Sequence, residues 1–301
     1  MWLNLISSLP FLVSLFWLVV FLANQRGADP ARKLLTYFML ICTILYFCHA
    51  VYFHKQIYLY SLIESIYTFT SLAVYPFYYL YICKLTSERS LKVRDYWVLL
   101  PALTISICSL LFYALMSENE RLNFVKSFLF DNDASTYGSS FAVSGQIIRI
   151  YITKLVFLVQ LIPVTYFGYK RLSNFNRQIN NFYSNTQNKT MAPIRIMLTL
   201  FILFAFFSAT ANHLGRSYFL QETGLIAIPS LIFSTMIFSV CFVGLKQSFT
   251  AKDFDLETRT AHKSEMNNPF SNQETLIERI RVLMEEELFL SRGIYKFLML
   301  L

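Results

Sequence analysis

The chain has 301 residues, of which 55% are apolar, 17% aromatic and only 15% charged. Soluble domains usually carry about 25% charged residues. Here the apolar residues fall in long runs, and residues 1–23 contain no acidic or basic side chain. Because a bilayer requires roughly 20 apolar residues per crossing helix, these features exclude an ordinary soluble domain and predict an integral membrane protein.

The formal net charge of +8 does not indicate nucleic-acid binding. Residues 1–245 carry 18 Lys and Arg against 9 Asp and Glu, whereas residues 246–301 carry 8 against 9. The basic surplus therefore lies in loops between membrane helices, where it sets their orientation. The polar C-terminal segment has no surplus of the kind that DNA-binding domains show.

Seven apolar runs have the length of membrane-spanning helices, and the third contains Pro76, which predicts a tilt or a kink. The expected fold class is all-α, a seven-transmembrane helix bundle (1-245) followed by a cytosolic linker (246-270) and a short cytosolic helical tail (271-301). The seven runs are 3–23, 34–53, 57–83, 96–116, 148–168, 196–214 and 224–245.

The loops predict the orientation of the bundle. The first, third and fifth loops hold 12 basic residues, and the second, fourth and sixth hold four. Cytoplasmic loops carry the excess of Lys and Arg. We therefore expect a multi-pass protein of the bacterial inner (plasma) membrane, with the N-terminus outside and the tail in the cytoplasm.

The segment between the fourth and fifth runs, residues 117–147, then lies outside. It mixes acidic residues with aromatic ones and with a run of small residues at 135–140. Two interpretations remain open, a lid over an outer pocket and a flexible connector.

The tail contains an amphipathic helix. Ser271 and Glu274 form a capping box, and apolar residues follow at helical spacing on one side of residues 271–290. A single helix cannot bury such a stripe alone. We expect it to contact a partner, which is the membrane, a second copy in a homodimer, or another subunit.

Charged residues inside membrane spans are costly and indicate functional sites. Glu64 and Lys154 are predicted at equal depth below the outer boundary, with opposite charges. They form either a structural ion pair or part of a pocket for a small anionic ligand from outside. The candidate site residues near this level are Glu64, Lys154, His49, Arg149, His213 and Arg216.

Signatures of enzymes, cofactor sites and metal sites are missing from the sequence. It contains no HExxH, CxxC, GxSxG or glycine-rich phosphate loop. His49 and His54 would lie on different faces of a helix, and the five cysteines all fall in apolar runs, where they are expected to be buried thiols. We expect no catalytic activity and no cofactor.

Two segments resemble a known family. YPFYYLYICKLTSERSLKVRDYWVLLPAL (Tyr75 to Leu103) is similar to the membrane part of Bacteroidetes transcription regulators, and LIERIRVLMEEELFL (Leu276 to Leu290) to the opening helix of their AraC-type DNA-binding domain. The resemblance implies about seven membrane helices, a cytosolic linker and an output domain with two helix-turn-helix units. After Leu290 the chain departs from that pattern, as a truncated or out-of-frame ending would.

The resemblance predicts the sensor and signal-transducing part of an AraC-type transcriptional regulator, with its output domain truncated. No recognition helix can be placed, so we expect no specific DNA binding. The tail helix could pair with a second copy or with an intact paralogue. Two alternatives stay open, a small-solute transporter and a partner-binding membrane subunit. The chain shows no internal repeat of the kind many transporters have.

Overall fold

The structure is a computed structural model that describes residues 2–25, 29–131, 138, 140–186, 189–214, 224–247, 249–267, 278, 280–282 and 284. These residues form helices and connecting turns, and they include no strand. The chain divides into two compact units, residues 1–251 and 252–301.

Seven helices of the described residues are long and apolar enough to cross a membrane, which confirms the predicted fold class. The chain is a multi-pass membrane protein. The fourth crossing combines the 3-10 helix η1 (Val93–Leu99) with α4. The crossing helices are α1 (Trp2–Ala23), α2 (Pro30–Phe53), α3 (Ile57–Leu85), α4 (Leu100–Leu115), α6 (Phe141–Phe182), α7 (Ala192–Leu214) and α9 (Ala227–Lys246).

Local capping explains where two helices begin earlier than predicted. The side chain of Asp29 accepts a hydrogen bond from the backbone N of Ala31, and Pro30 occupies the first turn, where its missing N–H costs nothing. The hydroxyl of Ser140 likewise accepts from the backbone N of Val143 at the start of α6. α6 therefore begins seven residues before the predicted start of the fifth span, residue 148.

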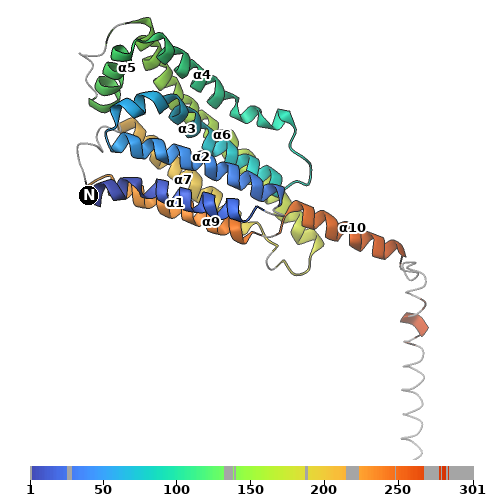
Figure 1. The fold of residues 1–301 in the computed structure, drawn as a ribbon. Coiled ribbons are helices and arrows are strands. Elements are labelled where there is room, and N and C mark those ends of the chain that lie inside the picture. The colour runs from blue at the N-terminus through green and yellow to red at the C-terminus, as the bar shows by residue number, and fades with distance from the viewer. Residues whose placement is uncertain are drawn as a thin grey trace, which may run out of the picture. The chain divides into compact units, whose positions relative to one another are not determined.

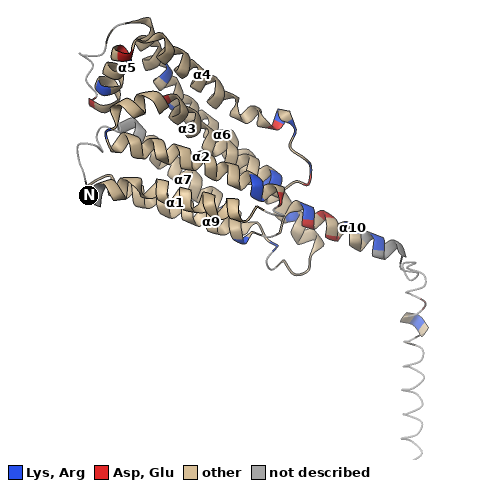
Figure 2. Ribbon diagram, in the orientation of Figure 1, with Lys and Arg blue, Asp and Glu red and all other residues tan. Residues whose placement is uncertain are grey.

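Six of the crossing helices close into a ring in the order α1, α2, α3, α6, α7 and α9, because each contacts the next and α9 contacts α1. We call these six helices the six-helix ring. α4 packs outside it, against α3 and α6 (Figure 1). Charged residues are sparse along the middle of the helices and gather towards their ends (Figure 2).

The two ends of the bundle are named by the helices that begin or end at each of them. We call the end where α1, α3, α6 and α9 begin the N-terminal face, and the opposite end, where α9 ends at Lys246, the C-terminal face.

A short helical segment packs on the N-terminal face. It consists of α5 (Glu118–Phe124) and the π-helix η2 (Val125–Asp131). Phe130 stacks on Tyr52, with ring centroids 4.4 Å apart, and the Tyr52 hydroxyl donates to the carbonyl of Leu129 at 2.7 Å. Residues 118–131, which were predicted as either a lid or a flexible connector, are thus ordered on the ends of α2 and α3.

All but the first residue of α10 (Ala251–Asn267) belongs to the second unit, and the helix lies within the segment that the sequence predicts as a linker. An ion pair one turn apart, Asp255 to Arg259 at 2.7 Å, supports it. Most of the predicted helix at 271–290, including Ser271 and Glu274, lies outside the described residues. Within it, residues 278, 280–282 and 284 are helical.

Candidate functional site

A buried ion pair joins α3 to α6. Nη2 of Arg149 lies 3.0 Å from each carboxylate oxygen of Glu64. Only 5% of the Arg149 side chain and 2% of the Glu64 side chain are exposed. Burying two such charges away from water is costly unless each of their polar atoms is hydrogen-bonded. The neighbouring side chains therefore decide whether the pair is stable.

Three further side chains complete this arrangement. Arg149 donates from Nε to Gln146 at 2.8 Å and from Nη1 to the Thr68 hydroxyl at 2.9 Å. The Ser109 hydroxyl donates to Glu64 at 3.0 Å, and the Gln146 amide donates to the carbonyl of Ser109 at 2.9 Å. We call Glu64, Thr68, Ser109, Gln146 and Arg149 the polar network. It links α3, α4 and α6 by bonds that replace the water lost on burial.

The structure pairs Glu64 with Arg149, whereas the sequence predicts Lys154 at the depth of Glu64. The difference comes from the start of the fifth span. Arg149 lies eight residues beyond Phe141, the first residue of α6, and Glu64 lies seven residues beyond Ile57, the first of α3. At 1.5 Å per residue, Arg149 matches the depth of Glu64, and Lys154 lies more than one turn deeper.

A cavity of about 200 Å³ lies inside the six-helix ring, and all six helices contribute to its wall. Four of the six candidate residues line it, namely Glu64, His49, Arg149 and Lys154. The side chain of His213 and the whole of Arg216 lie outside the described residues. No described residue of α5 or η2 lines the cavity.

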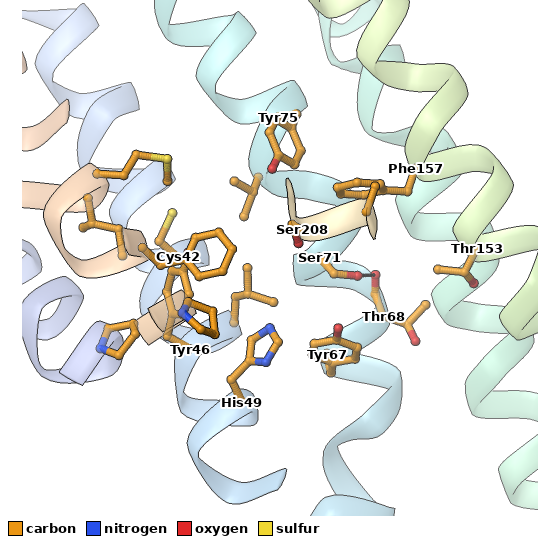
Figure 3. Close-up of a pocket in the computed structure, with 18 of the residues that line it drawn as sticks. Cys42, Tyr46, His49, Tyr67, Thr68, Ser71, Tyr75, Thr153, Phe157 and Ser208 are labelled. Atoms are coloured by element: carbon orange, nitrogen blue, oxygen red, sulfur yellow. Dashed lines mark hydrogen bonds between the residues drawn. The ribbon is translucent and has the colours of Figure 1, made fainter. Parts of the chain in front are cut away.

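The cavity wall is aromatic and polar. In Figure 3, Tyr75 and Phe157 lie at one end of the cavity, and His49 and Tyr67 at the other. His49 packs edge-on against Tyr67, with centroids 5.2 Å apart. Such a wall, apolar with a few fixed polar groups, is typical of small-molecule sites.

The formal charge of the cavity wall is positive. Glu64 and Arg149 both line it, and their charges cancel in the ion pair. Lys154 is partly buried and adds one positive charge, with histidine counted as neutral. Among the lining residues that the structure describes, the formal charges therefore sum to +1.

Thr68, Ser109 and Gln146 are not among the candidate residues predicted from the sequence. A signal was present for two of them, because Thr68 is four residues from Glu64 and Gln146 is three residues from Arg149. Side chains at these spacings lie on one face of a helix. Ser109 carries no such signal, because its place depends on how α4 docks onto α3.

Comparisons with protein-family models, with curated proteins and with solved structures find no match to this chain. The resemblance of Tyr75 to Leu103 to a family of regulators therefore remains a prediction.

Proposed function

We propose that this chain is a membrane-embedded receptor whose cavity binds a small anionic ligand and whose α9 passes the signal to the tail. One observation carries the proposal. α9 lines the cavity with residues such as Ser230 and Val240, and it is the helix that leads into the C-terminal segment. A ligand in the cavity contacts α9, so it favours whichever position of α9 it binds more tightly.

The loop charges support one orientation for this receptor. The C-terminal face carries the basic loops, the first, third and fifth, and the positive-inside rule assigns such loops to the cytoplasm. The N-terminal face is then external, in the inner membrane of a bacterium. Glu64, Arg149 and His49 lie in the half of the helices nearer the N-terminal face, so the polar part of the cavity would receive its ligand from outside.

The resemblance to AraC-type regulators suggests the output. In that family a membrane part precedes a cytosolic linker and a DNA-binding domain. The proposal assigns this chain the membrane and sensor part of such a regulator, in which the bound ligand acts on the segment after α9. Ligand binding and signal transfer through α9 are separate steps, and each has its own test.

Ligand binding is tested with the full chain in lipid nanodiscs, by calorimetric titration with acetate, succinate, inorganic phosphate and octanoate. We expect at least one of these anions to bind saturably. Lys154→Met should weaken that binding at least tenfold, because it removes a positive charge from the wall. Lys154→Arg should retain it.

The matched control is Lys170→Met. Lys170 lies on the same helix, with its Nζ 5.7 Å from the centre of the Tyr166 ring, and it does not line the cavity. Loss of binding in both variants, or in neither, would contradict the proposed site. Signal transfer is measured by amide hydrogen exchange at residues 247–251, which should change when the anion binds and stay unchanged in Lys154→Met.

A further inference from the structure

The connection from α3 to α4 carries a surplus of positive charge at the C-terminal face. Residues 84–97 hold four basic and two acidic residues, a formal surplus of two positive charges. Basic positions are visible where the chain enters α4 (Figure 2). Lys84 holds the turn after α3, because its Nζ donates to the backbone carbonyls of Glu88 and Arg89 at 2.9 and 3.2 Å.

Two of the basic side chains in this connection are exposed and carry no counter-charge among the described residues. Asp95 is engaged elsewhere, since its carboxylate accepts from the backbone N of Lys92 at 2.8 Å and lies 3.7 Å from Nη2 of Arg89. The side chains of Lys92 and Arg94 are exposed, and neither forms an ion pair with a described residue. Their charges are therefore available to an anion at the surface of the protein.

The exposed side of η1 mixes these charges with large apolar side chains. In a 3-10 helix, side chains three residues apart lie directly above one another, so Arg94 and Trp97 share a face. Trp97 is 69% exposed and Val93 is 84% exposed. At a membrane surface a tryptophan lies at the level of the lipid headgroups, and a basic side chain extends from its apolar stem towards the phosphates. The composition of this side of η1 fits that boundary.

The exposed face of α4 continues from η1 without a polar interruption at three positions with helical spacing. Leu100, Leu103 and Ile107 are between 47% and 50% exposed and lie on one side of the helix. α4 packs against α3 and α6 on its other side. A surface that is basic at η1 and apolar along α4 matches the two parts of a phospholipid, a charged headgroup and an acyl chain.

We propose that η1 and the start of α4 form a binding site for an anionic phospholipid. Its headgroup phosphate lies beside Lys92 and Arg94, and an acyl chain follows the exposed face of α4. The two basic side chains select an anionic lipid over a zwitterionic one, and the apolar face selects a lipid over a free phosphate ion. No lining residue of the cavity belongs to this site, so the proposal is independent of the receptor function.

Trp97 can report the lipid beside it. The other two tryptophans of the chain are Trp2 and Trp17, and changing both to Phe leaves Trp97 as the only indole. This full-length variant is placed in phosphatidylcholine vesicles that contain a small share of dibrominated phosphatidylglycerol or, separately, of dibrominated phosphatidylcholine. Quenching of Trp97 fluorescence by bromine measures how strongly each lipid binds there. Phosphatidylglycerol should bind at least fivefold more strongly, because each basic side chain near an anionic headgroup contributes about a factor of five.

Lys92→Gln combined with Arg94→Gln should lower this preference at least fivefold. The matched control is Lys33→Gln combined with Lys246→Gln. It removes the same charge from the same face at two exposed side chains, which lie on α2 and α9. The control should keep the preference. Its loss in both double variants would mean that the overall charge of the face attracts the lipid, and its loss in neither would mean that η1 does not.

A second measurement needs no change of tryptophan. Native mass spectrometry of the full chain, released from detergent, counts the lipids that it retains. Phosphatidylglycerol should be retained in preference to phosphatidylcholine, and the preference should again disappear only in the variant of Lys92 and Arg94. Glycerol 3-phosphate carries the phosphate without acyl chains and should not displace the lipid at constant ionic strength. Displacement by it, or equal retention of the two lipids by the unmodified chain, would overturn the lipid site.

Discussion

The α3–α4–α6 side of the bundle and the α1–α2–α9 side are held together in different ways. On the first side, buried polar groups bond between helices, as Ser109 of α4 does to Glu64 of α3. On the second side, the buried serines Ser14 and Ser234 bond within their own helix. Ser14 donates to the carbonyl of Phe11, and Ser234 to that of Ser230.

The α1–α2–α9 side is instead held by close packing. Trp17 meets Phe238 edge-on, with centroids 5.2 Å apart, and Cys241 Sγ lies 3.1 Å from Met39 Sδ. Gly244 lets α9 approach α2 so closely that an added Cβ would lie 2.4 Å from Leu35. In lipid there is no hydrophobic drive between helices, so association depends on packing and on hydrogen bonds. This protein uses close packing on both sides, because a Cβ at Gly145 of α6 would lie 2.4 Å from Phe112 of α4, and it adds hydrogen bonds between buried side chains on the first side.

The largest effect should follow from removing one partner of the buried ion pair. Arg149→Ala leaves the Glu64 carboxylate without its counter-charge in an apolar environment, which destabilises a protein by about 3–5 kcal/mol. We expect a large fall in melting temperature and in folded yield in detergent. Lys170→Ala, on the same helix and outside the polar network, should change neither by much.

A double variant distinguishes the loss of the pair from the loss of one charge. Glu64→Leu with Arg149→Leu removes both charges and should be more stable than either single variant, because no unpaired charge remains. If the double variant loses as much stability as the two single variants lose together, the ion pair does not account for the stability of this side.

A substitution that disturbs the close packing on the α1–α2–α9 side should destabilise the protein somewhat less. Gly244→Val places side-chain atoms where Leu35 already lies, and overpacking of this kind costs about 1–3 kcal/mol. Gly224→Val is the control, because a Cβ at Gly224 would meet nothing within 4 Å. Adding Leu35→Ala to Gly244→Val should recover part of the melting temperature. No recovery would mean that the contact with Leu35 is not the cause.

The seven crossings could be predicted from the sequence because the bilayer fixes the length and apolar character of a helix. The start of α6 could not. Gln146 lies outside the predicted fifth span and Arg149 is its second residue, and only the helix that begins at Phe141 shows that both point into the protein. Because the fifth span was predicted to begin at residue 148, Lys154 and not Arg149 was placed at the depth of Glu64.

The candidate site was predictable in part for a related reason. Charged residues inside spans are so costly that Glu64 and Lys154 stand out from the sequence alone, and both line the cavity. The cavity itself depends on which six helices close the ring. The exclusion of α4 from that ring follows from contacts between helices, which no local pattern encodes.

The smallest loss of stability should follow from removing one hydrogen bond between helices. Ser109→Ala removes a donor to Glu64, whose carboxylate still accepts from Arg149, so the cost should be about 0.6 kcal/mol and at most about 1.7 kcal/mol. Ser234→Ala is the matched control, a buried serine on α9 whose hydroxyl bonds only one turn back. The melting temperatures of the two variants in the same detergent measure the difference in their stability. If Ser234→Ala is as costly as Ser109→Ala, the hydroxyls on the two sides contribute equally, and only the Glu64–Arg149 pair distinguishes the α3–α4–α6 side.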